Sequence, residues 1–219
     1  MNFLYKAWFR GGNGLKLTRR DLVQAGALGL IACAARPAFA ATAIARPVQP
    51  QINPRLLERA KAALEAKRPF IKYGDVIGIT DFSQASRSER FYLVDLMGGM
   101  VTSYLVSHGR GSDPAHSGYL EHFSNNIGSE ASSAGAYVTD DVYYGKYGRS
   151  LRLRGLDYSN SNAEARAIVV HAARYAEADM VDRFGKLGRS EGCFALSQLS
   201  LQYVLQRLGP GRMIYADKV

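Results

Sequence analysis

Residues 188–193 read Gly-Arg-Ser-Glu-Gly-Cys and end on the second of the two cysteines in this chain of 219 residues. Upstream, residues 167–171 read Ala-Ile-Val-Val-His and end on a histidine that lies 22 positions before Cys193. Because β-branched residues favour strands, we expect His171 at the end of a buried strand and Cys193 in the loop that follows. No histidine occurs in the 26 residues after Cys193, so an imidazole that activates this thiol must lie upstream. Papain-like enzymes, in which the cysteine precedes the histidine, are thereby excluded.

The first forty residues have the composition of an export signal. Basic residues precede a mostly apolar run over residues 22–35, and Ala38-Phe39-Ala40 fits the small-x-small cleavage pattern. We therefore expect residues 1–40 to be a signal peptide, and Arg19-Arg20 resembles the twin-arginine type. The apolar run is too short for a span of about 20 residues, so we expect no stable membrane span. Lipidation at Cys33, in the sequence Leu-Ile-Ala-Cys, stays open as an alternative to cleavage after Ala40.

Removal of the signal would change the charge balance of the chain. The whole chain carries 28 basic and 19 acidic residues and a formal charge of +9, whereas residues 41–219 retain 22 and 18 and a charge of +4. The positive charge therefore belongs mostly to the export signal, and nucleic-acid binding loses its main support. The remaining length suits one domain with a sizeable core.

The hydrophobic pattern predicts a mainly β domain with flanking helices. Asn53-Pro54 opens a helical pattern that Pro69 ends, so residues 41–73 should form a linker and an N-terminal helix. Residues 197–208 have helical spacing and precede Gly209-Pro210. Strands are expected at residues 76–82, 91–96, 100–107, 136–139, 151–156, 167–171 and 213–216, with a hairpin at 97–99. Residues 74–219 should therefore form the main domain.

Cys193 and His171 form the candidate catalytic pair. A free thiol has a pKa of about 8.5, so an imidazole is needed to form the thiolate or to take the proton during attack. The loop before Cys193 does not have a core composition, which favours a nucleophile over an inert buried thiol. Gly192 lets the backbone approach a tetrahedral intermediate, and Arg189 suits a substrate carboxylate. Ser190 is either a simple turn residue or a positioning residue.

The other histidines do not indicate a metal site. His108, His116 and His122 are separated by eight and six positions, without a neighbouring cysteine or glutamate cluster, which is not a recognised zinc pattern. We expect neither a metal nor a cofactor. His108 and Tyr144 are expected to line the substrate cleft or to be structural.

The histidine, the loop and the Ser-x-Gly-Cys signature resemble the L,D-transpeptidases of bacterial cell walls, which have the YkuD-like fold, and in particular the murein L,D-transpeptidase catalytic domain family. The resemblance covers roughly residues 74–219. It rests further on residues 106–111, 123–125, 128–129, 132–135, 144–148, 151–156 and 165–171. It implies a β-sandwich, a backbone carbonyl around Ser190 that orients the imidazole, and an oxyanion hole made by the amides of Gly192 and Cys193. Glu191 and Phe194 depart from the common family form.

The resemblance also implies a function. The chain would be exported to the periplasm or cell envelope and would act on peptidoglycan stem peptides, forming cross-links through a thioester. With water as the acceptor, the same residues would make an L,D-carboxypeptidase. A sortase-like transpeptidase would want an arginine on a strand soon after the cysteine, whereas Arg207 and Arg212 lie in or past a helical pattern. A non-catalytic murein-binding module would not require a thiol and an upstream histidine. The oligomeric state stays open.

Overall fold

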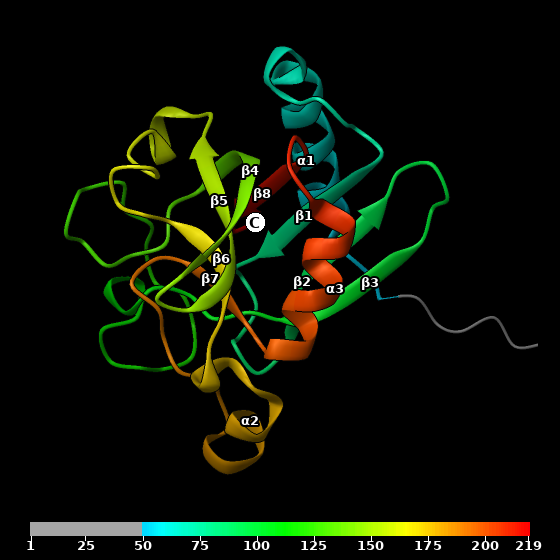
Figure 1. Cartoon of the computed structure of the whole chain (residues 1–219). Coiled ribbons are helices and arrows are strands. Elements are labelled where there is room, and N and C mark those ends of the chain that lie inside the picture. Colours follow the sequence, from blue (N-terminus) through cyan, green and yellow to red (C-terminus); the bar gives the residue numbers. More distant parts are fainter. Residues whose placement is uncertain (1–49) are drawn as a thin grey trace, which may run out of the picture. The chain divides into compact units, whose positions relative to one another are not determined.

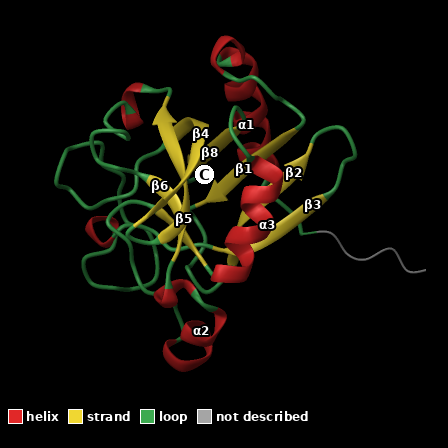
Figure 2. Ribbon diagram, in the orientation of Figure 1, coloured by secondary structure: helices red, strands yellow, loops and turns green. Residues whose placement is uncertain are grey.

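The computed structural model describes residues 50–219, which build one eight-stranded sheet flanked by helices (Figures 1 and 2). The predicted signal peptide and the Cys33 alternative lie outside the described residues. None of the helices in residues 50–219 combines the length and the apolar character that a membrane crossing requires. The elements are α1 (Pro54–Ala66), β1 (Val76–Asp81), β2 (Glu89–Asp95), β3 (Val101–Leu105), β4 (Gly135–Gly145), β5 (Gly148–Gly155), β6 (Val169–Ala172), α2 (Ala178–Phe184), β7 (Phe194–Leu196), α3 (Gln198–Leu208) and β8 (Met213–Asp217). The expected class, mainly β with flanking helices, is confirmed.

The sheet curls until its two edges meet. Its strand order is β3-β2-β1-β8-β4-β5-β6-β7, and the neighbours are antiparallel except for β1–β8 and β6–β7. Ser107, which follows β3, donates its N–H to the carbonyl of Ala195 in β7 at 2.9 Å. This bridge joins one edge of the sheet to the other and makes it nearly barrel-like. The two layers of the expected sandwich are therefore parts of one continuous sheet.

The two faces of the sheet bury different helices. On the inner face, α3 packs against a core that includes Phe91, Tyr137 and Phe194. On the outer face, α1 covers β1, β2, β4 and β8, and Ile77 and Ile79 belong to that cluster. The strand period of two separates these sets, because successive side chains point to opposite faces. In Figure 1, α3 lies across the sheet between the β1–β3 half and the β4–β7 half.

Local capping explains where the two long helices begin and end. The Asn53 side chain accepts a hydrogen bond from the Arg55 amide at 3.0 Å, and Pro54 occupies the first helical position of α1. Ser197 caps α3 in the same way through the Ser200 amide at 3.1 Å. Gly209 then ends α3. Both helices match the sequence prediction because these signals are local.

The β4–β5 hairpin, β7 and α2 differ from the sequence expectation. Strand β4 runs to Gly145 rather than ending at Thr139, because its exposed second half pairs with β5 across a tight turn. The three-residue β7 and the seven-residue α2 are too short to produce a periodic signal. The alternation in β5 is confirmed: Leu151 and Leu153 are buried, while Arg152 and Arg154 are exposed.

Candidate active site

Strands β6 and β7 place Cys193 and His171 on one face of the sheet. In their parallel register, Val170 pairs with Phe194 and His171 pairs with Ala195. Because Phe194 points into the inner core, the residues on either side of it, Cys193 and Ala195, point outward together with His171. Cys193 and His171 both line a pocket of about 360 Å³. Cys193 is the only cysteine among residues 50–219, and it is free.

The His171 ring is held in one tautomer. Its Nδ1 lies 2.9 Å from the carbonyl oxygen of Ala172, which can only accept, so Nδ1 carries the proton and Nε2 is the basic nitrogen. Burial lowers the pKa of His171 against the opposing effect of this hydrogen bond. The Tyr147 ring stacks on the imidazole with 4.3 Å between ring centroids. We expected a backbone carbonyl around Ser190 to orient the imidazole, and this is wrong. The Ser190 carbonyl accepts from the Arg110 amide at 2.7 Å, and the Ala172 carbonyl orients the imidazole instead.

The surroundings of Cys193 favour the protonated form of its thiol. Burial raises its pKa, the amide of Val169 opposes this, and the charge of Glu191 raises it further. The Sγ–H group donates to the carbonyl oxygen of Ala167 at 3.6 Å, and in residues 50–219 no hydrogen bond joins Sγ to the His171 ring. Ala167 itself has a φ of 51°, a strained backbone for a non-glycine residue. A neutral thiol beside a neutral imidazole suits proton transfer during attack rather than a preformed ion pair.

The Ser190 side chain closes the turn that carries the thiol. Its hydroxyl donates to the Cys193 carbonyl at 2.7 Å and accepts from the Gly192 amide at 3.1 Å. The Gly192 amide is therefore occupied, which contradicts its expected place in an oxyanion hole. Gly192 is needed for another reason: its φ is +110°, and a Cβ there would lie 2.6 Å from the Ala131 carbonyl oxygen.

Positive side chains surround the thiol. The pocket is lined by Arg110, Lys146, Arg166 and Arg189, and by one acidic residue, Glu191. Arg189 donates to the carbonyl oxygens of Asp113 and Pro114, so its guanidinium is held at the wall. This excess of cations suits a substrate that carries carboxylates. In residues 50–219, no group of three His, Cys, Asp or Glu side chains is placed to hold a metal ion.

His108 and Tyr144 do not line this pocket, which contradicts the expectation that they line the substrate cleft; for His108 the structural alternative holds. His108 is only 1% exposed. Its Nδ1 accepts from Arg90 at 2.7 Å, so its Nε2 carries the proton and donates to Asp113 at 3.1 Å. Tyr144 is 82% exposed on the β4–β5 hairpin, and Tyr147 from the turn of that hairpin lines the pocket instead.

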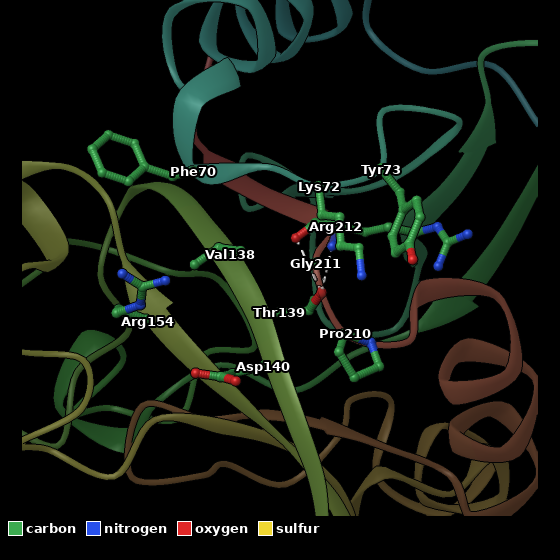
Figure 3. A pocket seen from close by; sticks show the side chains of 10 residues that line it. All are labelled: Phe70, Lys72, Tyr73, Val138, Thr139, Asp140, Arg154, Pro210, Gly211 and Arg212. Atoms are coloured by element: carbon green, nitrogen blue, oxygen red, sulfur yellow. Dashed lines mark hydrogen bonds between the residues drawn. The ribbon is translucent and has the colours of Figure 1, made fainter.

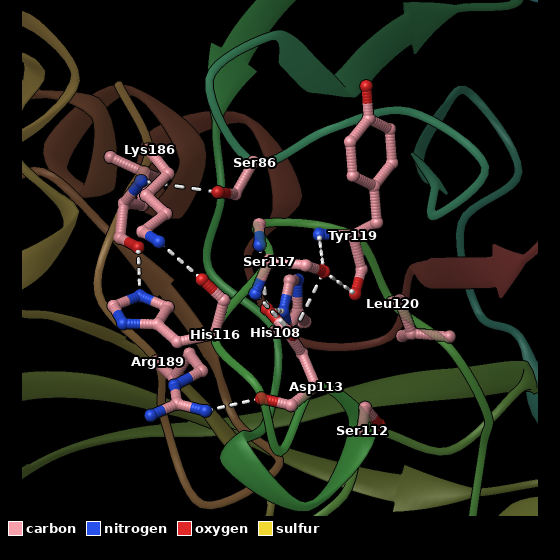
Figure 4. A network of polar contacts seen from close by, with 12 residues as sticks. Ser86, His108, Ser112, Asp113, His116, Ser117, Tyr119, Leu120, Lys186 and Arg189 are labelled. Atoms are coloured by element: carbon pink, nitrogen blue, oxygen red, sulfur yellow. Dashed lines mark hydrogen bonds and ion pairs between the residues drawn. The ribbon is translucent and has the colours of Figure 1, made fainter. Parts of the chain in front are cut away.

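The His108 region holds the loop of residues 187–190 that leads to Cys193 (Figure 4). The His108 carbonyl accepts from the Ser190 amide at 2.9 Å, and His116 Nε2 donates to the Leu187 carbonyl at 3.0 Å. Burial alone would raise the pKa of Asp113, but hydrogen bonds from the amides of Ser117 and Gly118 and from His108 lower it to about 2. Burial and the Arg90 charge lower the pKa of His108 to about 4. The cluster therefore pairs a carboxylate with a neutral imidazole.

Sequence reasoning missed several pocket residues. These are Arg110, Lys146, Tyr147, Arg166 and Tyr175. Two of them had a signal: Gly145 pairs with Gly148, so the two glycines mark Lys146-Tyr147 as a two-residue hairpin turn. The others reach the thiol from separate loops, and their spacing in the sequence gives no indication of this.

Comparison with known proteins gives one family. A family model described as "L,D-transpeptidase catalytic domain" matches residues 48–216. Similar solved structures include an L,D-transpeptidase from Mycobacterium smegmatis (14% identity, TM-score 0.40, covering 65% of this chain and 58% of that one). Another is L,D-transpeptidase 3 from Mycobacterium tuberculosis with a faropenem-derived adduct (14% identity, TM-score 0.42, covering 66% of this chain and 60% of that one). The helical cell shape determining protein Pgp2 from Campylobacter jejuni is a third (14% identity, TM-score 0.39, covering 68% of this chain and 50% of that one). This chain thus spans 50–60% of the length of these three chains. Among curated proteins, none matches it.

Proposed function

Since this chain belongs to the L,D-transpeptidase catalytic domain family, we propose that it transfers acyl groups between peptidoglycan stem peptides with Cys193 as the nucleophile. The observation that carries the proposal is that Cys193 and His171 line one pocket from neighbouring strands. The match of residues 48–216 to an L,D-transpeptidase catalytic domain favours this function over the sortase-like transpeptidase and the murein-binding module.

The first half of the reaction forms a thioester. Sγ of Cys193 turns from the Ala167 carbonyl toward the substrate and attacks the carbonyl carbon of the L-centre, while its proton passes to Nε2 of His171. The tetrahedral intermediate then collapses, and the carbon–nitrogen bond breaks. His171 returns the proton to the leaving amine, which departs as D-alanine. Since Ser190 occupies the Gly192 amide, we assign stabilisation of the oxyanion to the Cys193 amide and the surrounding cations.

The second half resolves the thioester. An amine of another stem peptide attacks the acyl carbon and loses a proton to His171, and the carbon–sulfur bond breaks to restore the thiol. The pocket cations, Arg189 among them, hold substrate carboxylates in both halves. Water in place of the amine gives the L,D-carboxypeptidase reaction with the same residues.

The direct test is turnover of purified tetrapeptide muropeptides followed by mass spectrometry. We expect release of D-alanine and cross-linked products, and loss of both in Cys193→Ala by roughly 10⁴-fold or more. Cys193→Ser should be nearly inactive, because an alkoxide forms much less readily than a thiolate. Unchanged thermal melting shows that the variants are folded. Tripeptide without cross-links would identify the carboxypeptidase, and undiminished D-alanine release from Cys193→Ala would exclude this nucleophile.

A β-lactam offers a second test of the same thiol. We expect a carbapenem to acylate Cys193, because its strained carbonyl presents the electrophile that the thiol attacks in the stem peptide. Intact-mass analysis should show one added carbapenem on the peptide containing Cys193. An adduct on another residue alone would contradict the mechanism.

The proposed substrate requires export. We propose that residues 1–40 direct the chain to the periplasm or cell envelope by the twin-arginine route. Changing Arg19 and Arg20 to lysine should then leave the precursor in the cytoplasm. Continued secretion would indicate the general route, and an N-terminus at a lipid-modified Cys33 would replace the cleavage site after Ala40.

A further inference from the structure

Three neighbouring pockets extend from Cys193 along the outer face of the sheet. Ala167 lines both the Cys193 pocket and a neighbouring pocket of about 240 Å³. Asp140 lines that second pocket and also a third pocket of about 650 Å³ (Figure 3). Because each neighbouring pair shares a wall residue, the three pockets lie next to one another in a row, and we call this row the groove.

The strand register explains why the path stays on one face. Leu151 pairs with Val170, which pairs with Phe194, and this row faces the inner core. The next row, which contains Arg152 and its partner Val169, therefore faces outward with Cys193. At a strand spacing of about 4.8 Å, the backbone of Arg152 lies roughly 10 Å from that of Cys193. Arg154 lies about 7 Å further along β5 on the same face.

The far end of the groove offers two cations beside an exposed ring. Within residues 50–219, no ion pair or hydrogen bond engages the charged end of Lys72 or of Arg154, whereas Asp75 binds Arg212 through two contacts of 2.8 Å. Phe70 is 55% exposed at the same pocket, whereas Lys72 Nζ and the Arg212 guanidinium lie over the Tyr73 ring, 5.1 Å and 5.0 Å from its centroid. Figure 3 shows Phe70 and Arg154 on one side of β4, and Lys72 and Tyr73 on the other. A flat apolar ring beside cations suits a ligand that combines sugar rings with carboxylates.

The length of the groove selects a polymer over a single stem peptide. Once D-alanine has left, a tetrapeptide stem retains three residues on the acyl side, and these reach about 10 Å from Cys193. The backbone of Arg154 at the third pocket, about 10 Å across the sheet and about 7 Å along β5 from that of Cys193, lies beyond that reach. Asp140 and Glu164 line the middle of the path, where carboxylates can accept hydrogen bonds from hydroxyl and amide groups.

We propose that this groove binds the glycan–peptide polymer from which the reacting stem peptide projects, with carboxylates at Lys72 and Arg154 and a sugar ring against Phe70. The assignment rests on the proposed function, because that function places a stem peptide in the Cys193 pocket. The groove thus makes the protein act on assembled peptidoglycan in preference to free muropeptides.

The test compares charge-reversal variants of the purified protein in binding to insoluble peptidoglycan sacculi. Lys72→Glu with Arg154→Glu should weaken binding about tenfold, which corresponds to about 1.4 kcal/mol. Arg55→Glu with Arg87→Glu is the matched control, since both arginines are exposed and line none of the three pockets. Phe70→Ala should weaken binding without any change of charge. Turnover on sacculi should fall in proportion to binding when it is normalised to turnover on soluble tetrapeptide.

Competition identifies what the groove recognises. Soluble glycan chains bearing stem peptides should displace the protein from sacculi, whereas polyglutamate of equal charge should displace it poorly. Equal competition by polyglutamate, or equal binding of the groove variant and its control, would overturn the proposal. The sacculus binding assay needs no turnover, so the two proposals can fail separately. If the parent protein processes no muropeptide, the proposed function is contradicted. Binding of the groove variant to sacculi still tests the role of the groove.

Discussion

His171 and His108 are both buried histidines that follow a strand or end one, yet the two regions use them in opposite ways. Around His171, a backbone carbonyl holds Nδ1, and the other ring nitrogen belongs to a pocket shared with a thiol. Around His108, Arg90 and Asp113 occupy both ring nitrogens, and the side chain is closed off from the pocket. Burial lowers the pKa of both imidazoles. The availability of one ring nitrogen, rather than burial or pKa, therefore distinguishes the candidate base from the structural histidine.

The largest expected effect separates the two histidines by activity. His171→Gln should lower kcat/KM roughly 10²–10⁴-fold, because proton transfer from the thiol and to the leaving amine loses its base. It should also slow alkylation of Cys193 near neutral pH and raise the apparent pKa of the thiol.

The matched control is His108→Gln, whose amide can still accept from Arg90 and donate to Asp113. We expect it to lower the melting temperature while the alkylation profile against pH keeps its midpoint. A His171→Gln profile that superimposes on the parent would assign His171 a structural role and remove the contrast between the regions.

A smaller effect separates the regions by acid stability. The pKa of His108 falls from 6.5 to about 4 on folding, so between these pH values the unfolded chain binds a proton that the folded chain does not. The free energy of unfolding should therefore decrease as the pH falls through this window, by on the order of 3 kcal/mol from His108. Asp113, with a pKa of about 2, extends the loss below pH 4 for the same reason.

Urea unfolding between pH 7 and pH 4 measures this dependence. In His108→Gln the pH dependence should be shallower, and what remains includes the contribution of His171, whose pKa is also lowered. A parent protein whose stability is flat across this window, or a variant with the parent's slope, would contradict a buried neutral His108.

The smallest effect concerns Glu191, whose carboxylate lies two residues before Cys193. Burial is the main cause of the raised pKa of Cys193, and Glu191 adds to it, so Glu191→Gln should lower that pKa and speed alkylation at neutral pH. The Glu191 side chain is 62% exposed, so solvent screens its charge and the gain should stay within about threefold. Glu65→Gln, on the exposed face of α1, is the control. Slower alkylation in Glu191→Gln would show that this carboxylate assists the thiol.

Several elements and the Cys193–His171 pair could be predicted because their signals are local. Asn53-Pro54 and Ser197 mark helix starts through their own caps, and the run before His171 is β-branched. The predicted substrate residues fared differently. Tyr144 and Tyr147 lie three positions apart in the same hairpin. Which of the two rings stacks on the imidazole of His171 depends on how the hairpin turn packs beside that residue, and Tyr147 is the one that does. The sequence spacing holds no information on that choice.

By itself, the sequence determined the mainly β class, the two long helices and a thiol that follows its histidine, because each depends on neighbouring residues. Only the tertiary structure decided which histidine is closed off, which carbonyl orients His171 and which amide Ser190 occupies. Those outcomes depend on contacts between distant segments, such as Arg90 with His108 and the bridge between Gly109 and Ser190. The curling of the sheet brings these segments together, and the strand order places Arg152 and Arg154 of β5 between Cys193 and the pocket lined by Phe70. A linear pattern does not encode such distances, because packing fixes them only after the strands have paired.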